Sequence, residues 1–197
     1  ELNITPEKLI EESKKEHIED FADFHIEFDN YHTTHSEENR MLSELIYNNL
    51  QDKGVIERRE FEQYYDEDEE MFLPDRYIKG TCPKCGAKDQ YGDSCEKCGG
   101  TYSSTEVIDP ISVISNSKPI KKKTEHLFFK LADYEKFLSN WLTNNRVQKE
   151  INNKMREWLS DGLSSWDITR DKPYFGFNIP GEKEKFFYVW LDAPVGY

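Results

Sequence analysis

The chain has 197 residues, of which 36% are hydrophobic and 14% aromatic, and its formal net charge is −13. This length and apolar content can bury the core of one or two domains, so a disordered chain is excluded although 33% of residues are charged. The negative charge repels phosphate backbones, which excludes an autonomous basic nucleic-acid-binding module. No apolar run approaches the roughly 20 residues that a membrane span needs, and no signal peptide is recognisable, so we expect no membrane partner.

The start of the chain predicts a helix, a short strand and a loop. Thr5 can cap a helix whose first turn contains Pro6, and apolar residues at helical spacing extend this helix over residues 5–22. A strand is expected over 25–28 and a polar loop over 29–36.

A second helix is predicted to begin at a capping box formed by Thr34 and Glu37 and to end at Gly54. Its apolar residues mark one face of the helix: Leu42, Leu45, Ile46 and Leu50. The helix–strand–helix order is typical of one half of a layered α/β fold.

The region after Gly54 changes to β-structure around a glycine-rich segment. Five strands are expected, over residues 55–65, 71–78, 101–103, 106–108 and 125–129. The acidic run 66–70 predicts a solvated turn. The basic run Lys118–Lys123 predicts a solvated loop, with contact to a phosphate as the alternative.

Two helices follow these strands. Asp133 can cap the first and Asn145 the second, which Asp161 and Gly162 then stop. The second helix carries an apolar stripe that we expect in the core: Val147, Ile151, Met155, Trp158 and Leu159.

The chain has four cysteines, Cys82, Cys85, Cys95 and Cys98, in two matching Cys-x-x-Cys-Gly turns. Two such turns supply four sulfurs, which make a full tetrahedral shell for Zn²⁺. Two disulfides, or iron with the same ligands, are the alternatives. The shell leaves no open position and its surroundings have few apolar residues, so we predict a structural metal that replaces a missing core.

Near the end of the chain, residues 185–191 form the continuous run Lys-Phe-Phe-Tyr-Val-Trp-Leu. Such a run is typical of a strand buried on both faces of a parallel sheet, and we predict one here. Ligands of open α/β sheets bind beyond the carboxyl ends of the strands, which favours a site over 190–197.

Five segments together resemble bacterial methionyl-tRNA synthetases, in that family's order and at its spacing, across nearly the whole chain. They are Asp-Asn-Tyr-His-Thr-Thr-His-Ser-Glu-Glu-Asn at 29–39, the doubled cysteine turn, Trp-Asp-Ile-Thr-Arg-Asp at 166–171, Pro-Tyr-Phe-Gly at 173–176 and Tyr-Val-Trp-Leu-Asp-Ala-Pro-Val-Gly-Tyr at 188–197.

The resemblance implies an α/β fold class, namely part of a Rossmann-type catalytic fold interrupted by an α+β connective domain with a zinc knuckle. Residues 1–54 would then be the C-terminal part of the first Rossmann half. Residues 55–184 would be the connective peptide domain, with the knuckle at 81–102. Residues 185–197 would be the first strand and loop of the second Rossmann half.

The family activates methionine with ATP and transfers it to tRNA(Met) in the cytoplasm, with one structural Zn²⁺ in the connective peptide. The family's adenylate-forming signatures, His-Ile-Gly-His and Lys-Met-Ser-Lys-Ser, are absent from this chain, as is the anticodon-reading helical domain. We therefore expect an internal fragment that contains no catalytic residue and is inactive alone, because it lacks the groups that stabilise the transferring phosphates. Whether Lys118–Lys123 contact tRNA stays open.

Four residues at the end of the chain match the family's methionine pocket: Trp190, Ala193, Pro194 and Tyr197. A thioether favours a polarizable, mostly apolar wall with aromatic contacts to sulfur. Ordinary core packing of the two aromatic residues is the alternative.

Arg170, with Trp166 nearby in sequence, resembles a family position at the mouth of that pocket, where a guanidinium would pair with the methionine carboxylate. A structural pair with Asp167 or Asp171 is the alternative.

Tyr31, His32 and His35 lie in a loop that borders the catalytic cleft in the family, where a neutral histidine would contact ATP or the adenylate. A capped turn without any role is the alternative. The remaining histidines receive no role: His17, His25 and His126.

Two other functions compete with a synthetase. One is a zinc-ribbon interaction module without an enzymatic parent, against which the acidic charge and the segment 190–197 argue. The other is an editing domain that hydrolyses mischarged tRNA, although the insertion shows no threonine-rich pocket.

Overall fold

The computed structural model describes residues 4–144 and 146–196. Asn145 and Tyr197, named above as a cap and as a pocket residue, lie outside the described residues. The helices are α1 (Pro6–Asp23), α2 (Glu37–Asp52), α3 (Glu135–Trp141), α4 (Lys149–Asp161) and α5 (Val189–Asp192). The strands are β1 (Ile56–Asp66), β2 (Met71–Phe72), β3 (Ile78–Thr81), β4 (Gln90–Tyr91), β5 (Ile108–Ser112), β6 (Ile120–Phe129), β7 (Trp166–Asp167), β8 (Thr169–Asp171) and β9 (Lys185–Phe187).

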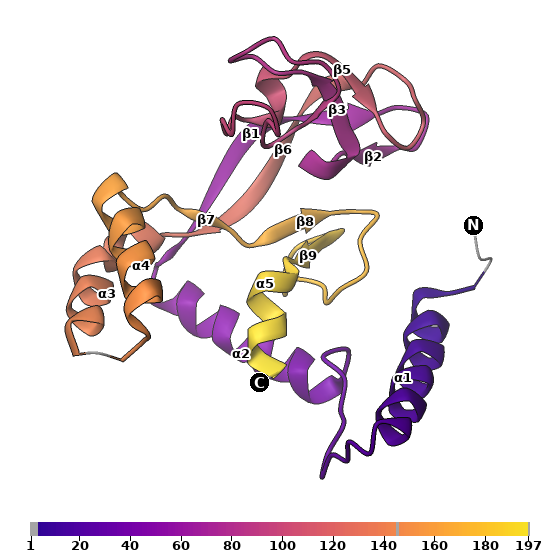
Figure 1. Cartoon of the computed structure of the whole chain (residues 1–197), viewed down its shortest axis with the longest axis vertical. Coiled ribbons are helices and arrows are strands. Elements are labelled where there is room, and N and C mark those ends of the chain that lie inside the picture. The colour runs from indigo at the N-terminus through magenta and orange to yellow at the C-terminus, as the bar shows by residue number, and fades with distance from the viewer. Residues whose placement is uncertain (1–3, 145, 197) are drawn as a thin grey trace.

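The strands form three sheets, with orders β2-β1-β6-β7, β4-β3-β5 and β8-β9. The longest ladder joins β1 to β6, in a register that runs from Ile56 opposite Phe129 to Tyr65 opposite Ile120. In Figure 1 this ribbon leads from the body that contains α2 to α5 up to a lobe with β3 and β5. The cysteine turns lie in that lobe, between β3 and β5 in the chain.

The predicted parallel Rossmann sheet is wrong for the residues that the structure describes, where every strand pairing is antiparallel. The run 185–191 is not one buried strand. Strand β9 ends at the fully buried Phe187, and α5 begins at Val189 with Trp190 64% exposed. A continuous apolar run cannot distinguish a strand from a strand followed by a helical turn, because it carries no periodicity. The fold is a mixed α/β arrangement.

The first predicted helix is confirmed as α1, with the Thr5 hydroxyl accepting from the Lys8 N–H at 3.3 Å. The strand expected over 25–28 is wrong. His25 has a φ of 56°, and the Ile26 N–H donates back to the Phe21 carbonyl at 2.8 Å, so the chain turns at the end of the helix.

The second predicted helix is confirmed as α2, but its cap and its buried face differ from the prediction. Ser36 caps it, accepting from the Asn39 N–H at 3.2 Å. The buried residues of α2 are Asn39, Ser43 and Tyr47, whereas three members of the predicted apolar face are 40–55% exposed: Leu42, Leu45 and Ile46. Helix α2 packs against α5 and the residues that follow it.

The strand predicted at 55–65 is confirmed as β1, shifted by one residue, and the strand predicted at 125–129 lies within β6. Over 71–78, the 3-10 helix Asp75–Tyr77 follows Pro74 and separates β2 from β3. The strands expected at 101–103 and 106–108 reduce to an isolated bridge at Thr101 and to the start of β5. The basic run is not a loop, because β6 begins at Ile120 and its first lysines lie outward on the paired strand.

The expected core stripe of α4 is wrong, since α4 contains no buried residue and Trp158 is 55% exposed. The cap at Asp133 is also wrong, because that residue lies inside a 3-10 helix and α3 starts at Glu135. The main core lies where α2, β6, β9 and α5 meet: Tyr47, Leu127, Ile168, Phe177, Ile179, Phe187 and Leu191. Among the described residues no helix is both long and apolar enough to cross a membrane.

Candidate metal centre and substrate cavity

The four cysteines converge on one point, as their spacing predicts. Their Sγ atoms all lie within 4.8 Å of one another, with Cys82 and Cys98 at 4.0 Å and Cys85 and Cys95 at 3.6 Å. Four sulfurs bonded to Zn²⁺ at about 2.3 Å in a tetrahedron lie about 3.8 Å apart. The residues therefore fit a zinc ion, and the cysteines are free rather than paired in disulfides.

The glycine after each cysteine pair closes its turn. Gly86 and Gly99 have φ values of 73° and 67°, in the left-handed region that side chains other than glycine disfavour. Their N–H groups donate to the carbonyls of Cys82 and Cys95 at 3.0 and 2.8 Å. The two turns are thus matched in backbone geometry as well as in sequence.

Backbone N–H groups also point at the sulfurs. The Lys84 and Cys98 N–H groups each lie 3.4 Å from the Sγ of Cys82 and Cys95 respectively. Burial raises the pKa of the Cys82 thiol, but N–H donors from Cys85 and Lys84 outweigh it and lower the pKa to about 7. For Cys85 the balance is opposite, because the Ala87 N–H donor lowers the pKa but burial and the neighbouring sulfurs outweigh it and raise the pKa to about 12. A thiol with a lowered pKa is available as thiolate, which is the form that binds metal.

A second candidate site is a cavity of about 680 Å³ between the lobe with β3 and β5 and the segment from β8 to α5. Asp75 and Asp93 line it from the lobe, and Arg170 and Trp190 line it from the other side. Tyr174 and Tyr188 add aromatic walls. The structure therefore brings together Arg170 and Trp190, which are 20 positions apart in the sequence.

Arg170 is held on β8 by three contacts. Its Nη1 donates to the Thr169 carbonyl at 2.6 Å and lies 3.4 Å from Asp167 Oδ2, while its guanidinium covers the Tyr188 ring at 3.6 Å. Within the described part of the chain, its Nε and Nη2 make no protein hydrogen bond. The guanidinium is thus fixed in place with donors left for a carboxylate.

Trp190 projects from the short helix α5 with most of its surface open. The α5 N-terminus is anchored by Tyr174, whose hydroxyl accepts from the Val189 N–H at 3.2 Å. Partial burial raises the pKa of Tyr174, which keeps the hydroxyl neutral. Tyr174 is not among the site residues that the sequence predicts, although it lies in the Pro-Tyr-Phe-Gly segment that contributes to the family resemblance.

Within the part of the chain that the structure describes, the other predicted substrate-binding residues do not line this cavity. Trp166 pairs with Phe129 across β7 and β6 and packs against the main core. Ala193 and Pro194 lie in the 3-10 helix Ala193–Gly196. The Tyr31 ring meets the ring of Phe21 on α1 edge-on, with a centroid distance of 5.6 Å.

His32 and His35 differ in their surroundings. His32 Nε2 lies 3.6 Å from a Glu38 carboxylate oxygen at the surface. The His35 ring lies on Phe175, with a centroid distance of 4.6 Å, and is thereby close to a wall of the cavity.

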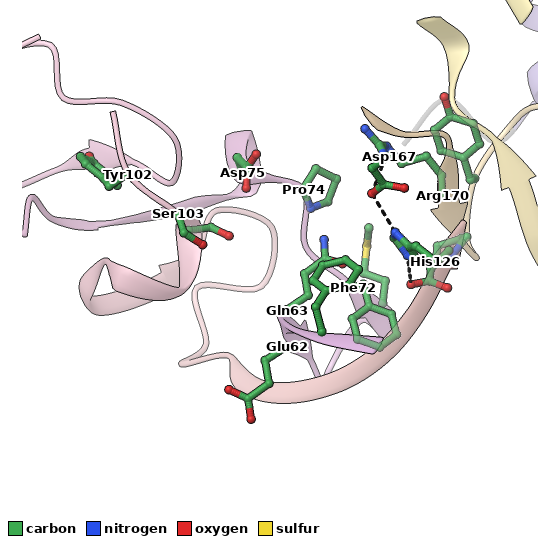
Figure 2. A pocket seen from close by; sticks show the side chains of 16 residues that line it. Glu62, Gln63, Phe72, Pro74, Asp75, Tyr102, Ser103, His126, Asp167 and Arg170 are labelled. Atoms are coloured by element: carbon green, nitrogen blue, oxygen red, sulfur yellow. Dashed lines mark hydrogen bonds and ion pairs between the residues drawn. The ribbon is translucent and has the colours of Figure 1, made fainter. Parts of the chain in front are cut away.

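A buried ionic cluster around His126 was missed by sequence reasoning. His126 lines a smaller cavity of about 300 Å³ that shares Asp75, Arg170 and Tyr174 with the larger one. Figure 2 shows the side chains that line it. The sequence signal for it is the pair Asp167 and Asp171 on either side of Arg170. These acidic residues lie on β7, which pairs with the strand that carries His126, and on β8, which contacts that strand.

The family described as tRNA synthetases class I (M) matches the chain over residues 1–197. The chain therefore belongs to the class I tRNA synthetases, in their methionyl family. A zinc-ribbon module without a synthetase parent is excluded by this match.

Solved structures of Mycobacterium tuberculosis methionyl-tRNA synthetase have a similar fold. They are the free state (TM-score 0.54, 88% of this chain covered), a form bound by methionyl-adenylate (0.56, 87%) and a complex with methionyl-adenylate (0.57, 90%). Each is 18% identical to this chain, which spans 30% of the length of each.

Proposed function

We propose that the protein to which this chain belongs activates methionine with ATP to methionyl-adenylate and transfers the methionyl group to tRNA(Met). The observation that carries this proposal is the cavity in which Arg170 and Trp190 face a common space. A fixed cation beside an exposed aromatic surface suits an amino acid with a carboxylate at one end and a thioether at the other. Membership of the methionyl family supports the same substrate.

The proposed roles follow from the chemistry of each group. Arg170 pairs with the methionine carboxylate through the donors that the protein leaves free. Trp190 provides the polarizable wall for the sulfur, where an aromatic contact contributes about 0.3–1.5 kcal/mol. Ala193, Pro194 and Tyr197 are assigned to the methionine pocket on the family resemblance alone, since Ala193 and Pro194 do not line this cavity.

Trp166, Tyr31 and His32 are proposed as more peripheral substrate contacts. Trp166 lies on β7, directly before the strand that carries Arg170. Tyr31 and His32 precede the start of α2, in the loop that we assign to the ATP and adenylate side of the cleft.

The metal is proposed to be one structural Zn²⁺ held by Cys82, Cys85, Cys95 and Cys98. When bound, it cross-links the two cysteine turns. A shell of four protein sulfurs leaves no position for water, so we assign the metal no step in the reaction. The parts of the catalytic fold are proposed at 1–54 and 185–197, with the connective peptide over 55–184 between them.

The test is methionine-dependent exchange of pyrophosphate into ATP by the full-length protein. Trp190→Ala should raise the KM for methionine while leaving the KM for ATP close to its normal value. Phe137→Ala, which removes another aromatic side chain that is 64% exposed but lies on α3, is the matched control. A methionine KM that is unchanged in Trp190→Ala would reject the role of Trp190.

The chain alone is proposed to be inactive in the same assay, since it lacks both adenylate-forming signatures. Exchange activity of the isolated 197 residues would overturn this.

A further inference from the structure

His126 is a buried histidine whose two ring nitrogens both face carboxylates. The residue is 3% exposed. Its Nδ1 lies 2.8 Å from Asp167 Oδ2 and its Nε2 lies 2.9 Å from Asp171 Oδ2 (Figure 2). A neutral imidazole carries one proton, so it can donate to only one carboxylate. Two donor contacts to two carboxylates require the imidazolium.

Charged groups on the surrounding strands balance this cluster. Asp171 also accepts from the Thr124 hydroxyl at 2.7 Å and pairs with Lys185 of β9. Burial alone would lower the pKa of His126, but the hydrogen bonds to Asp167 and Asp171 outweigh it, so its pKa is raised.

Strand β1 presents an aromatic side chain and two charged side chains to this region. Phe61 meets the ring edge-on, with a centroid distance of 4.9 Å. Arg59, opposite His126 in the register, is engaged by Glu57 and Ser165. Glu62 points away from the cluster (Figure 2).

The cluster is connected to Arg170 through one atom. Asp167 Oδ2, which accepts from His126, is the same oxygen that lies 3.4 Å from Arg170 Nη1. The other oxygen of Asp167 accepts from the Thr169 N–H at 2.9 Å, so the carboxylate is held at both ends. The shorter contact goes to His126, and Arg170 keeps donors free for the cavity.

We propose that His126, as an imidazolium, is a positioning residue for Arg170. It satisfies the charge of Asp167 and fixes its orientation, which keeps Arg170 from closing onto that carboxylate and presents the guanidinium to the carboxylate of the amino-acid substrate. This inference rests on the proposed function. It predicts that loss of the imidazolium weakens recognition of the substrate carboxylate in particular.

The test uses the full-length protein and two ligands that differ in one group. The KM for methionine and the inhibition constant of methioninol, the amino alcohol without the carboxylate, are measured in pyrophosphate exchange from about pH 6 to about pH 10. His126→Gln should raise the KM for methionine roughly tenfold at the acidic end, with kcat less affected, because a charge-assisted contact is lost. Methioninol inhibition should change less than about twofold, since it makes no carboxylate contact to lose.

The pH dependence gives a second readout that needs no variant. In the wild type, the ratio of the methionine KM to the methioninol inhibition constant should rise with pH as His126 loses its proton, and in His126→Gln it should not. His25→Asn, which removes an exposed imidazole that does not line the cavity, should behave as the wild type.

Each result decides the proposal. An unchanged methionine KM in a folded His126→Gln protein, or an equal loss for both ligands, would overturn the positioning role alone. If that variant does not fold, a wild-type ratio that stays flat over the whole pH range overturns it. Wild-type protein without methionine-dependent exchange would instead remove the proposed function itself.

Discussion

The side-chain amide of Asn39 on α2 donates to the main-chain carbonyl of Asp192 on α5, at 3.1 Å, across 153 positions of sequence. The same amide donates to the Thr34 carbonyl at 2.9 Å. Asn39 is 4% exposed, so both bonds are shielded from water. One side chain thus ties the loop before α2 to the helix that carries Trp190.

Loss of the two hydrogen bonds of the Asn39 amide should lower the stability of the protein. Asn39→Ala removes both donors and leaves two carbonyls without a partner, so we expect the free energy of unfolding to fall by about 1–3 kcal/mol. Urea unfolding measures the loss. Asn48→Ala makes the same change on the exposed side of α2 and should shift stability by less than about 0.5 kcal/mol. Equal effects of the two changes would contradict the tie.

Metal removal should unfold the cysteine turns in the lobe with β3 and β5, and the body that contains α2 to α5 should stay folded. Cys95→Ser, or a chelator that strips the metal, removes the cross-link in a segment with little apolar core, so we expect the amides of 81–102 to lose protection from hydrogen exchange. Elemental analysis should give one zinc per chain in the wild type and less in Cys95→Ser. Ser94→Ala, between the two turns, is the control. A wild-type protein that contains neither zinc nor iron would contradict the site.

Two glycines of the lobe should respond differently to an added methyl group. A Cβ on Gly86 would meet no atom within 4 Å, so Gly86→Ala bears only the strain of its positive φ, about 1 kcal/mol. A Cβ on Gly80 would lie 2.5 Å from Val107 Cγ1 and 2.7 Å from the Ile108 carbonyl oxygen, which is backbone and cannot turn aside. Gly80→Ala should cost about 3 kcal/mol. Thermal unfolding of both variants ranks them, and the reverse order would contradict these contacts.

The His126 cluster should stabilise the protein most in mild acid. The pKa of His126 is raised, so its contribution is complete below the unfolded value of about 6.5 and disappears as the pH rises through the folded value. Burial raises the pKa of Asp171, but bonds from His126, Lys185 and Thr124 outweigh it. Its pKa is therefore lowered, and its contribution is present above about pH 3.9 and lost as the pH falls through the folded value.

The stability lost in His126→Gln should accordingly be largest between about pH 4 and about pH 6.5 and should shrink in alkali. Urea midpoints of the variant and the wild type across this range measure it. A difference that grows toward alkaline pH would show that the histidine is neutral in the folded protein.

The sequence predicted local features where one physical requirement dominates. Tetrahedral metal chemistry needs four sulfurs, so the paired Cys-x-x-Cys turns specified their own convergence. Thr5 and Pro6 marked the start of α1 because a helix end must satisfy its N–H groups locally. The family could also be inferred from the order of short motifs.

Features that depend on distant partners were not predictable in this way. Leu45 on α2 is apolar yet 55% exposed, whereas Ser43 on the same helix is fully buried. Periodicity identifies the apolar face of a helix but not which neighbours are present to cover it. The His126 cluster was not predictable for the same reason. His126 contacts Asp167 and Asp171 only because the fold brings β6, β7 and β8 together.

The long β1–β6 ribbon has a consequence for the architecture. The strands enter and leave the body side by side, with Ile56 opposite Phe129, so the chain returns to its point of departure after the whole lobe has been built. A lobe of another size could be attached to the same two positions without changing the spacing between α2 and the segment that carries Arg170. The ribbon therefore allows the lobe to differ in size while α2 and the segment from β8 to α5 keep their positions.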